Sequence, residues 1–323
     1  MAGGFAANTR RKLVQQPVMT KPAGGGLTQL AIQRTGLLAR IYLFITATVA
    51  GVPAAPNALG MCSAIRRVRL VANSGLELFS VSGPGWHYML QHHLRSEYFP
   101  VTGQNDGNLA PADATSYNLS MMIPVAVSDM DFTGVVLTQS EQILVTLEID
   151  WETDANVTGG VATYTAQCVP YVEFYSIPAD PADAPDLSRA HVILEETRTI
   201  AGAGEQVYEP LRRPTYLQLM HGSGFGTAGA DNVDRVQLRI EQSNYLFDAN
   251  LDLVNQLWWA QHGYARPAGV WAFDWMASSG LGNYGGARDR VNTATITSFE
   301  SVFNALGAGQ LTTIRRMLID LAR

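Results

Sequence analysis

The stretch Arg67-Val-Arg-Leu-Val-Ala-Asn-Ser-Gly-Leu-Glu-Leu-Phe79 sets the plan of this chain, because an imperfect copy returns as Arg235-Val-Gln-Leu-Arg-Ile-Glu-Gln-Ser-Asn-Tyr-Leu-Phe247. Five identities recur at one constant spacing without a gap: Arg67 and Arg235, Val68 and Val236, Leu70 and Leu238, Leu78 and Leu246, and Phe79 and Phe247. In both copies apolar residues alternate with polar ones, which is the pattern of a half-buried strand. Each copy therefore predicts a β-strand.

A segment with helical spacing follows each copy. The apolar positions are Trp86, Met89, Leu90 and Leu94 after the first copy, and Leu251, Val254, Leu257 and Trp258 after the second. Upstream, Tyr42–Ile45 resembles Tyr216–Leu219, six residues out of step. A unit of strand, loop, strand, turn and helix is thus predicted to occur twice, and such a repeat bears on the whole fold. The alternative to duplication is that short apolar segments recur by chance.

Composition favours a two-domain protein with covered surfaces. A chain of 323 residues suits two domains with well-buried cores. Only 15% of its residues are charged, against about 25% in a typical soluble domain, which favours a subunit of an assembly. Cys62 and Cys168 lie in apolar segments without metal-ligand spacing, so we expect buried thiols of a protein made in a reducing compartment. The N-terminus lacks the apolar core of a signal peptide, so cytoplasmic synthesis is expected.

Charge is distributed unevenly along the chain. Residues 1–76 contain nine Lys or Arg and no acid, although the net charge is −6. Residues 1–26 are rich in Gly, Ala and Gln and predict an extended or mobile basic arm. Its candidate contacts to nucleic acid or to an anionic membrane are Arg10, Arg11, Lys12 and Lys21. A solvated arm without a ligand is the alternative.

Many short strand-like segments separated by turns predict an all-β fold of two tandem β-sandwiches, with Greek-key or jelly-roll connections and one short inserted helix in each. The segment Pro178–Asp186 contains three prolines and three aspartates and predicts the boundary between them. The expected domains are residues 27–180 and 181–323. Phe299–Leu306 has helical spacing and predicts a short helix, whereas Leu311–Arg323 fits a helix or a closing strand equally well.

No motif in the sequence calls for catalysis, a cofactor or a metal. Gly224–Gly229 spells G-x-G-x-x-G but leads into a predicted strand, where a phosphate site needs a helix N-terminus. His87, His92 and His93 lack metal-ligand spacing on a helix. No nucleophile motif is present. We therefore predict no catalytic, cofactor-binding or metal-binding residues and a protein that is not an enzyme.

The repeat also carries a resemblance to a known family. Residues 35–43, the stretch 67–79 with its helix, and their counterparts at 213–219 and 235–259 resemble the double jelly-roll major capsid proteins of tailless icosahedral viruses, here of a bacteriophage. This lineage includes tectiviruses, corticoviruses and adenoviruses, and the resemblance covers nearly all of residues 27–310. It implies a homotrimer forming a pseudo-hexagonal capsomer, in which duplication supplies six similar edges.

The same resemblance implies partners and a location. They are neighbouring capsomers, minor capsid or vertex proteins, and an internal membrane or genome that meets the N-terminal arm. The protein would be made in the host cytoplasm and reside in the virion. Two alternatives remain open at the level of sequence. One is a minor capsid or spike protein of the same virus; the other is a glycan-binding or glycan-cleaving sandwich that uses Trp271 and Trp275.

Overall fold

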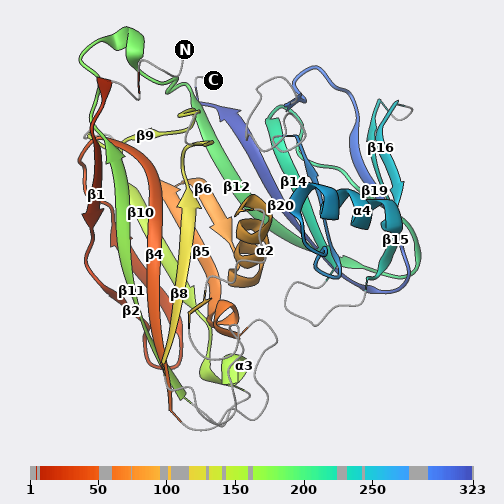
Figure 1. The fold of residues 1–323 in the computed structure, drawn as a ribbon, viewed down its shortest axis with the longest axis horizontal. Helices are drawn as coiled ribbons and strands as arrows, with labels where there is room; N and C mark the ends of the chain where they lie inside the picture. The colour runs from red at the N-terminus through yellow and green to blue at the C-terminus, as the bar shows by residue number, and fades with distance from the viewer. Residues whose placement is uncertain are drawn as a thin grey trace. The chain divides into compact units, whose positions relative to one another are not determined.

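The computed structural model describes residues 5, 8–50, 60–73, 75–94, 101–102, 116–128, 131–139, 143–158, 163–223, 231–241, 244–275 and 290–321. Its contacts divide the chain into two compact units, each described separately below (Figure 1). The first unit comprises Met1–Leu90, Phe99–Leu194 and Asp320–Arg323, and the second comprises Gln91–Tyr98 and Glu195–Ile319. The predicted boundary at residues 180 and 181 stays a prediction.

Two sets of antiparallel strands make up most of the first unit, and Ile193 and Leu194 add a short parallel pairing to the second set. In spatial order, the strands of the first sheet are β1 (Arg11–Gln15), β11 (Thr163–Tyr175), β4 (Leu37–Ala50), β8 (Ser116–Pro124) and β7 (Val101–Thr102), with β2 (Met19–Thr20) paired to β11 and β9 (Val136–Leu137) to β4. The strands of the second are β3 (Gly26–Ala31), β10 (Val145–Trp151), β5 (Ile65–Ala72) and β6 (Leu76–Val81). The helical elements that begin in the first unit are η1 (Gly60–Ala64), α2 (Gly83–Leu94), α3 (Asp154–Thr158) and η2 (Pro181–Asp183). The last residues of α2, from Gln91, belong to the second unit.

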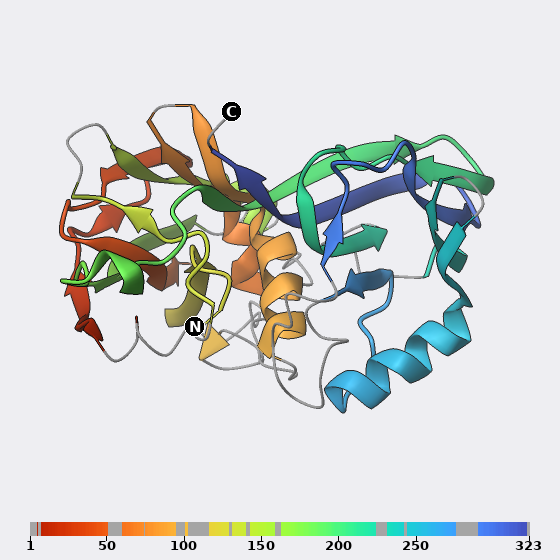
Figure 2. The same ribbon diagram turned by 90° about the horizontal axis from the view of Figure 1, so that it is seen from above.

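The second unit repeats this plan. One set of paired strands is β12 (Arg189–Ile200), β20 (Gly309–Asp320), β14 (Thr215–Ser223) and β17 (Val270–Asp274), with β18 (Val291–Asn292) paired to β14. The residues of β12 up to Leu194 belong to the first unit, and those from Glu195 to the second. The other set is β13 (Gly204–Tyr208), β19 (Phe299–Ala305), β15 (Val233–Ile240) and β16 (Asn244–Asn250). Its helix is α4 (Leu251–His262), which Figure 2 shows beside these strands. In each unit the first strand thus lies beside the last, β1 beside β11 and β12 beside β20, as a jelly-roll connection produces.

The predicted duplication is confirmed, and it reaches the register of individual residue pairs. Strands β5 and β15 have the same length, as do helices α2 and α4, and one constant offset in residue number relates both pairs. Leu70 pairs with Phe79 as Leu238 pairs with Phe247, and in both copies the register shifts at the next residue. Such a bulge bends and twists a strand locally. Two bulges at equivalent positions indicate a true structural repeat rather than a chance similarity between short sequence segments.

Each copy is a hairpin followed by a helix, whereas the sequence pattern alone predicted a strand. The turn residues Asn73 and Glu241, which are equivalent in the two copies, have positive φ values of 52° and 55°. Asn tolerates this left-handed conformation better than most residues because its short side chain forms local hydrogen bonds. Here the Asn73 Oδ1 accepts a hydrogen bond from the Leu144 N–H at 3.0 Å. The alternation continues past the turn in the sequence, which is why it concealed the reversal.

Two further predictions are settled by pairing. The short helix predicted at Phe299–Leu306 is wrong, because Phe299–Ala305 is strand β19, paired with β13 on one side and β15 on the other. Its helical spacing arises because both faces are largely buried, so apolar residues do not alternate strictly. The ambiguous C-terminal segment is the closing strand β20, which pairs with β14.

The N-terminal segment is also placed by pairing. Arg11–Gln15 forms β1, an edge strand of the first sheet, and residues Met19–Thr20 pair with the same neighbour, β11. In the second unit β12 holds the corresponding place beside β20. Part of the segment expected to be an arm therefore supplies the first strand of the first sandwich. Within the described residues, no helix has the length and apolar character needed to cross a membrane.

Candidate functional site

The four basic residues predicted to meet a membrane or genome occupy different environments. Arg10, Arg11 and Lys12 lie at the start of β1 and are exposed. Lys21 is buried: its ammonium lies 3.0 Å from the Asp154 carboxylate and 4.1 Å from the centre of the Tyr164 ring. A buried, paired ammonium stabilises the fold locally and is not available to an external phosphate. The exposed candidates are therefore confined to residues 10–12.

Arg11 takes part in a polar cluster on the first sheet. Its guanidinium donates to the Glu173 carboxylate at 2.6 Å, and the Tyr42 hydroxyl donates to the same oxygen at 3.1 Å. Arg40 lies 3.7 Å from the other carboxylate oxygen. The Glu173 side chain is fully buried. It lies on β11, between β1, which carries Arg11, and β4, which carries Arg40. The hydrogen bond to Glu173 raises the pKa of Arg11, so this cation is held in place as a cross-strand clamp.

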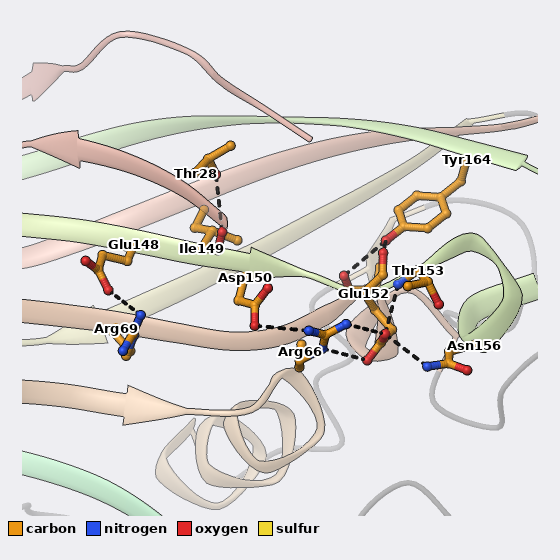
Figure 3. Close-up of polar contacts among 11 residues, drawn as sticks. Thr28, Arg66, Arg69, Glu148, Ile149, Asp150, Glu152, Thr153, Asn156 and Tyr164 are labelled. Atoms are coloured by element: carbon orange, nitrogen blue, oxygen red, sulfur yellow. Dashed lines mark hydrogen bonds and ion pairs between the residues drawn. The ribbon is translucent and has the colours of Figure 1, made fainter. Parts of the chain in front are cut away.

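Arg66 and Arg69 of β5 are paired with carboxylates and do not form a phosphate site (Figure 3). Arg66 contacts Glu152 at 3.0 Å and Asp150 at 3.5 Å. Arg69 contacts Glu148 at 2.7 Å. The hydrogen bond from Arg66 holds the pKa of Glu152 below its ordinary value. These partly exposed pairs, laid across β5 and β10, join neighbouring strands and neutralise one another.

The rings of His92 and His262 lie 4.5 Å apart, but no group of three or more potential metal ligands occurs in the described part of the chain. Burial lowers the pKa of His87 to about 4 and that of His221 to about 3. His221 lies between the hydroxyls of Thr313 and Ser301 at 2.9 and 3.1 Å. This row contains a serine and a histidine, but its atoms are enclosed in the core, where a substrate cannot reach them. It is a hydrogen-bonded core network.

Both cysteines are free and buried, as predicted. Burial raises the pKa of Cys62 to about 12 and also raises that of Cys168. A thiol that stays protonated is a poor nucleophile and a poor metal ligand. These residues therefore act as small apolar side chains of the core.

The tryptophans do not form a common surface platform. Trp271 is 1% exposed and stacks on His221, with ring centres 5.4 Å apart, whereas Trp259 is 64% exposed on α4. Trp258 is buried and Trp275 is half-buried. The glycan platform hypothesised at Trp271 and Trp275 would need both rings at the surface, so Trp271 is not available to it. The G-x-G-x-x-G segment at 224–229 lies outside the described residues.

The chain is similar to known proteins at the level of structure. No protein-family model matches the sequence, and no curated protein sequence matches it. The solved major capsid protein (MCP) of STIV, the Sulfolobus turreted icosahedral virus, is similar over 96% of each chain, with 13% identity and a TM-score of 0.73. The major capsid protein P2 from bacteriophage PM2 is similar over 97% of this chain and 99% of its own, with 14% identity and a TM-score of 0.57. The PBCV-1 virus capsid is similar over 96% and 94%, with 10% identity and a TM-score of 0.62.

This chain has the double jelly-roll fold. The similarity spans both units, so the double jelly roll accounts for the hairpin and helix that recur at one fixed offset. It also explains why β1 matters, since a jelly roll needs its first strand beside its last. Sequence reasoning missed β1 because its pattern, exposed on both faces, carries no alternation. It also missed Glu173, whose partners Arg11 and Arg40 are remote in sequence.

Proposed function

We propose that this protein is a viral major capsid protein that builds an icosahedral shell and has no catalytic role. The single observation that supports the proposal most strongly is the match to viral capsid proteins over 96% of the chain, across both units. The described residues are consistent with it, because the histidine and cysteine side chains that the structure describes are buried and the basic residues are largely paired.

Three copies would form a pseudo-hexagonal capsomer in this proposal. Two units with one topology supply two similar sets of edges per chain, so a trimer presents six. The partners would be the same protein in the capsomer, neighbouring capsomers, and minor capsid or vertex proteins. Synthesis in the host cytoplasm and residence in the virion, of a bacteriophage in the first instance, follow from the same proposal.

The exposed cations Arg10, Arg11 and Lys12 would face an internal membrane or the genome. The first acidic residue of the chain is Glu77, so no acid near them in the sequence offsets their charge, and their position at an edge strand leaves them at the surface. Lys21 is left out of this role because it is buried against Asp154. Arg11 is exposed but already paired with Glu173, so the role rests mainly on Arg10 and Lys12. Co-sedimentation with anionic vesicles or DNA should weaken in an Arg10→Glu, Lys12→Glu double variant, and unchanged binding would remove this part of the proposal.

Light scattering coupled to size exclusion tests the main proposal. We expect a mass near three chains, and negative-stain images with a pseudo-sixfold outline. A monomer that does not assemble at high protein concentration would contradict the major capsid role. Particles in which the protein occurs in only a few copies would favour the minor capsid alternative.

A further inference from the structure

A hollow of about 270 Å³ opens in the second unit beside α4. Its lining comes from α4, β15, β16 and β17, together with His92, and all of these residues belong to the second unit. Four aromatic rings contribute: Phe247, Trp258, Phe273 and Trp275. Among the described residues that line it, Asp274 is the one carboxylate, and none is Lys or Arg.

Asp274 places a carboxylate in a hollow whose other described lining residues, apart from His92, are aromatic or aliphatic. Its side chain is 7% exposed, and its Oδ2 accepts a hydrogen bond from the Gln218 amide at 3.1 Å. The His92 Nδ1 lies 3.4 Å from the same oxygen, and the His92 ring meets the Trp258 ring edge-on at 4.8 Å. These neighbours fix the carboxylate, whose charge acts on a nearby cation through space without a direct hydrogen bond. The hollow therefore combines aromatic walls with a negative charge held at a fixed place.

The first copy of the repeat shows what keeps the hollow open. At the constant offset of the repeat, Val254 corresponds to Trp86, which is fully buried with its ring 5.4 Å from that of Phe79. Phe79 in turn corresponds to Phe247 in the hollow. The backbone register of the two hairpins is the same, so the difference is one of side-chain size. An indole fills in the first unit a place that an isopropyl group leaves open in the second.

We propose that this hollow binds a small organic cation of the alkylammonium class, such as a quaternary ammonium group. Ring faces attract cations through their quadrupole, and an aromatic box around an ammonium group is a recurrent solution for quaternary ligands. Asp274 supplies the counter-charge, and its burial strengthens that attraction. The same carboxylate disfavours anions such as fatty acids. The volume, near the lower end for ligand sites of about 300–1,000 Å³, restricts the ligand to a head group with a short tail.

This site is independent of the proposed capsid role, since it lies within one unit and needs no second copy. The probe is choline chloride, titrated into the full-length protein by calorimetry, against its neutral isostere 3,3-dimethylbutan-1-ol. We expect saturable binding of choline, with the isostere weaker by about 3- to 30-fold, the range that a desolvated cation–π interaction supplies. Equal affinities, or no heat at millimolar choline, would overturn the proposal.

Variants locate the site. Asp274→Asn should weaken choline about tenfold and leave the isostere unchanged, while Asp252→Asn on α4, outside this hollow, removes an equal charge and should change neither. Val254→Trp copies the first unit and should abolish binding of both probes. If that variant does not fold, Leu257→Trp, at a 38% exposed position on the rim, serves instead. The assignment would be overturned if choline still bound as tightly to Asp274→Asn, or to a folded variant in which the introduced tryptophan fills the hollow.

Two sources of the same chemistry can be separated. Phosphatidylcholine vesicles that compete with choline would identify a lipid head group as the ligand, whereas saturable choline binding without vesicle competition would identify a free cation. Either outcome supports the alkylammonium class. Choline could instead change the mass of the oligomer without binding saturably to each chain. That result would show that the hollow is a contact between copies, and it would overturn the proposal.

Discussion

Neutralising Glu173 gives the sharpest test of how the first sandwich is held together. In a Glu173→Gln variant, Arg11 and Arg40 lose the carboxylate that they share. The Arg11 side chain is 58% exposed and can turn into water, so its share of the loss is small, about 0–1 kcal/mol. The Arg40 side chain is 12% exposed and keeps a poorly hydrated charge. Removing one partner of a fully buried pair costs about 3–5 kcal/mol.

Because only one of the two arginines is nearly buried, we expect a total loss of about 2–4 kcal/mol in the free energy of unfolding, including the hydrogen bond from Tyr42. Urea denaturation measures this loss. Hydrogen exchange of residues 11–15 should accelerate as well, since Arg11 ties β1 to β11. The matched control is Glu148→Gln, which breaks the more exposed pair with Arg69 and should cost less than about 1 kcal/mol. Equal costs for the two variants would refute the clamp.

Three further predictions concern the hairpin, its helix and the buried histidine. Gly83→Ala should destabilise the first unit by about 2 kcal/mol or more in chemical denaturation, because a Cβ there would lie 1.9 Å from the Cys62 carbonyl oxygen. The control is Leu251→Ala, at the equivalent residue of α4, which should cost less. Equal losses of stability in the two variants would contradict this reasoning. Asn73→Ala should cost about 1–2 kcal/mol through the positive φ and the lost hydrogen bond, and a neutral result in a thermal melt would count against it. His221 stays neutral when folded, with a pKa of about 3, but takes up a proton near pH 6.5 when unfolded, so stability should fall as the pH drops from 6.5 towards 3. His221→Gln should flatten that slope, and an unchanged slope in pH-dependent melts would exclude His221 as its source.

Prediction from the sequence succeeded where local patterns repeat. The stretch at 67–79 and its copy at 235–247 led to the all-β class and to two tandem jelly rolls, each with a short helix. The fold comparison bears out that class across the chain. The same patterns failed at Phe299–Leu306, because a strand paired on both sides and buried on both faces has no period of two to display.

The candidate site was less accessible to sequence reasoning. Among the basic residues 10–12 and Lys21, charge alone could not separate exposed side chains from one paired with Asp154, which is remote in the sequence. Sequence reasoning also placed Trp271 and Trp275 together in a hypothetical glycan site, and packing separates them: Trp271 is in the core, while Trp275 lines the hollow beside α4.

The order of residues alone establishes that one unit of structure occurs twice, because identities at a constant spacing, and alternation along a strand, need no knowledge of contacts. The other features depend on tertiary structure. The hairpin turns at Asn73 and Glu241, the pairing of β1 with β11, and the burial of Glu173 follow from which strands meet. The hollow beside α4 depends on side-chain volume: Val254 and Trp86 are both apolar in a pattern, and only packing shows that one leaves space and the other fills it.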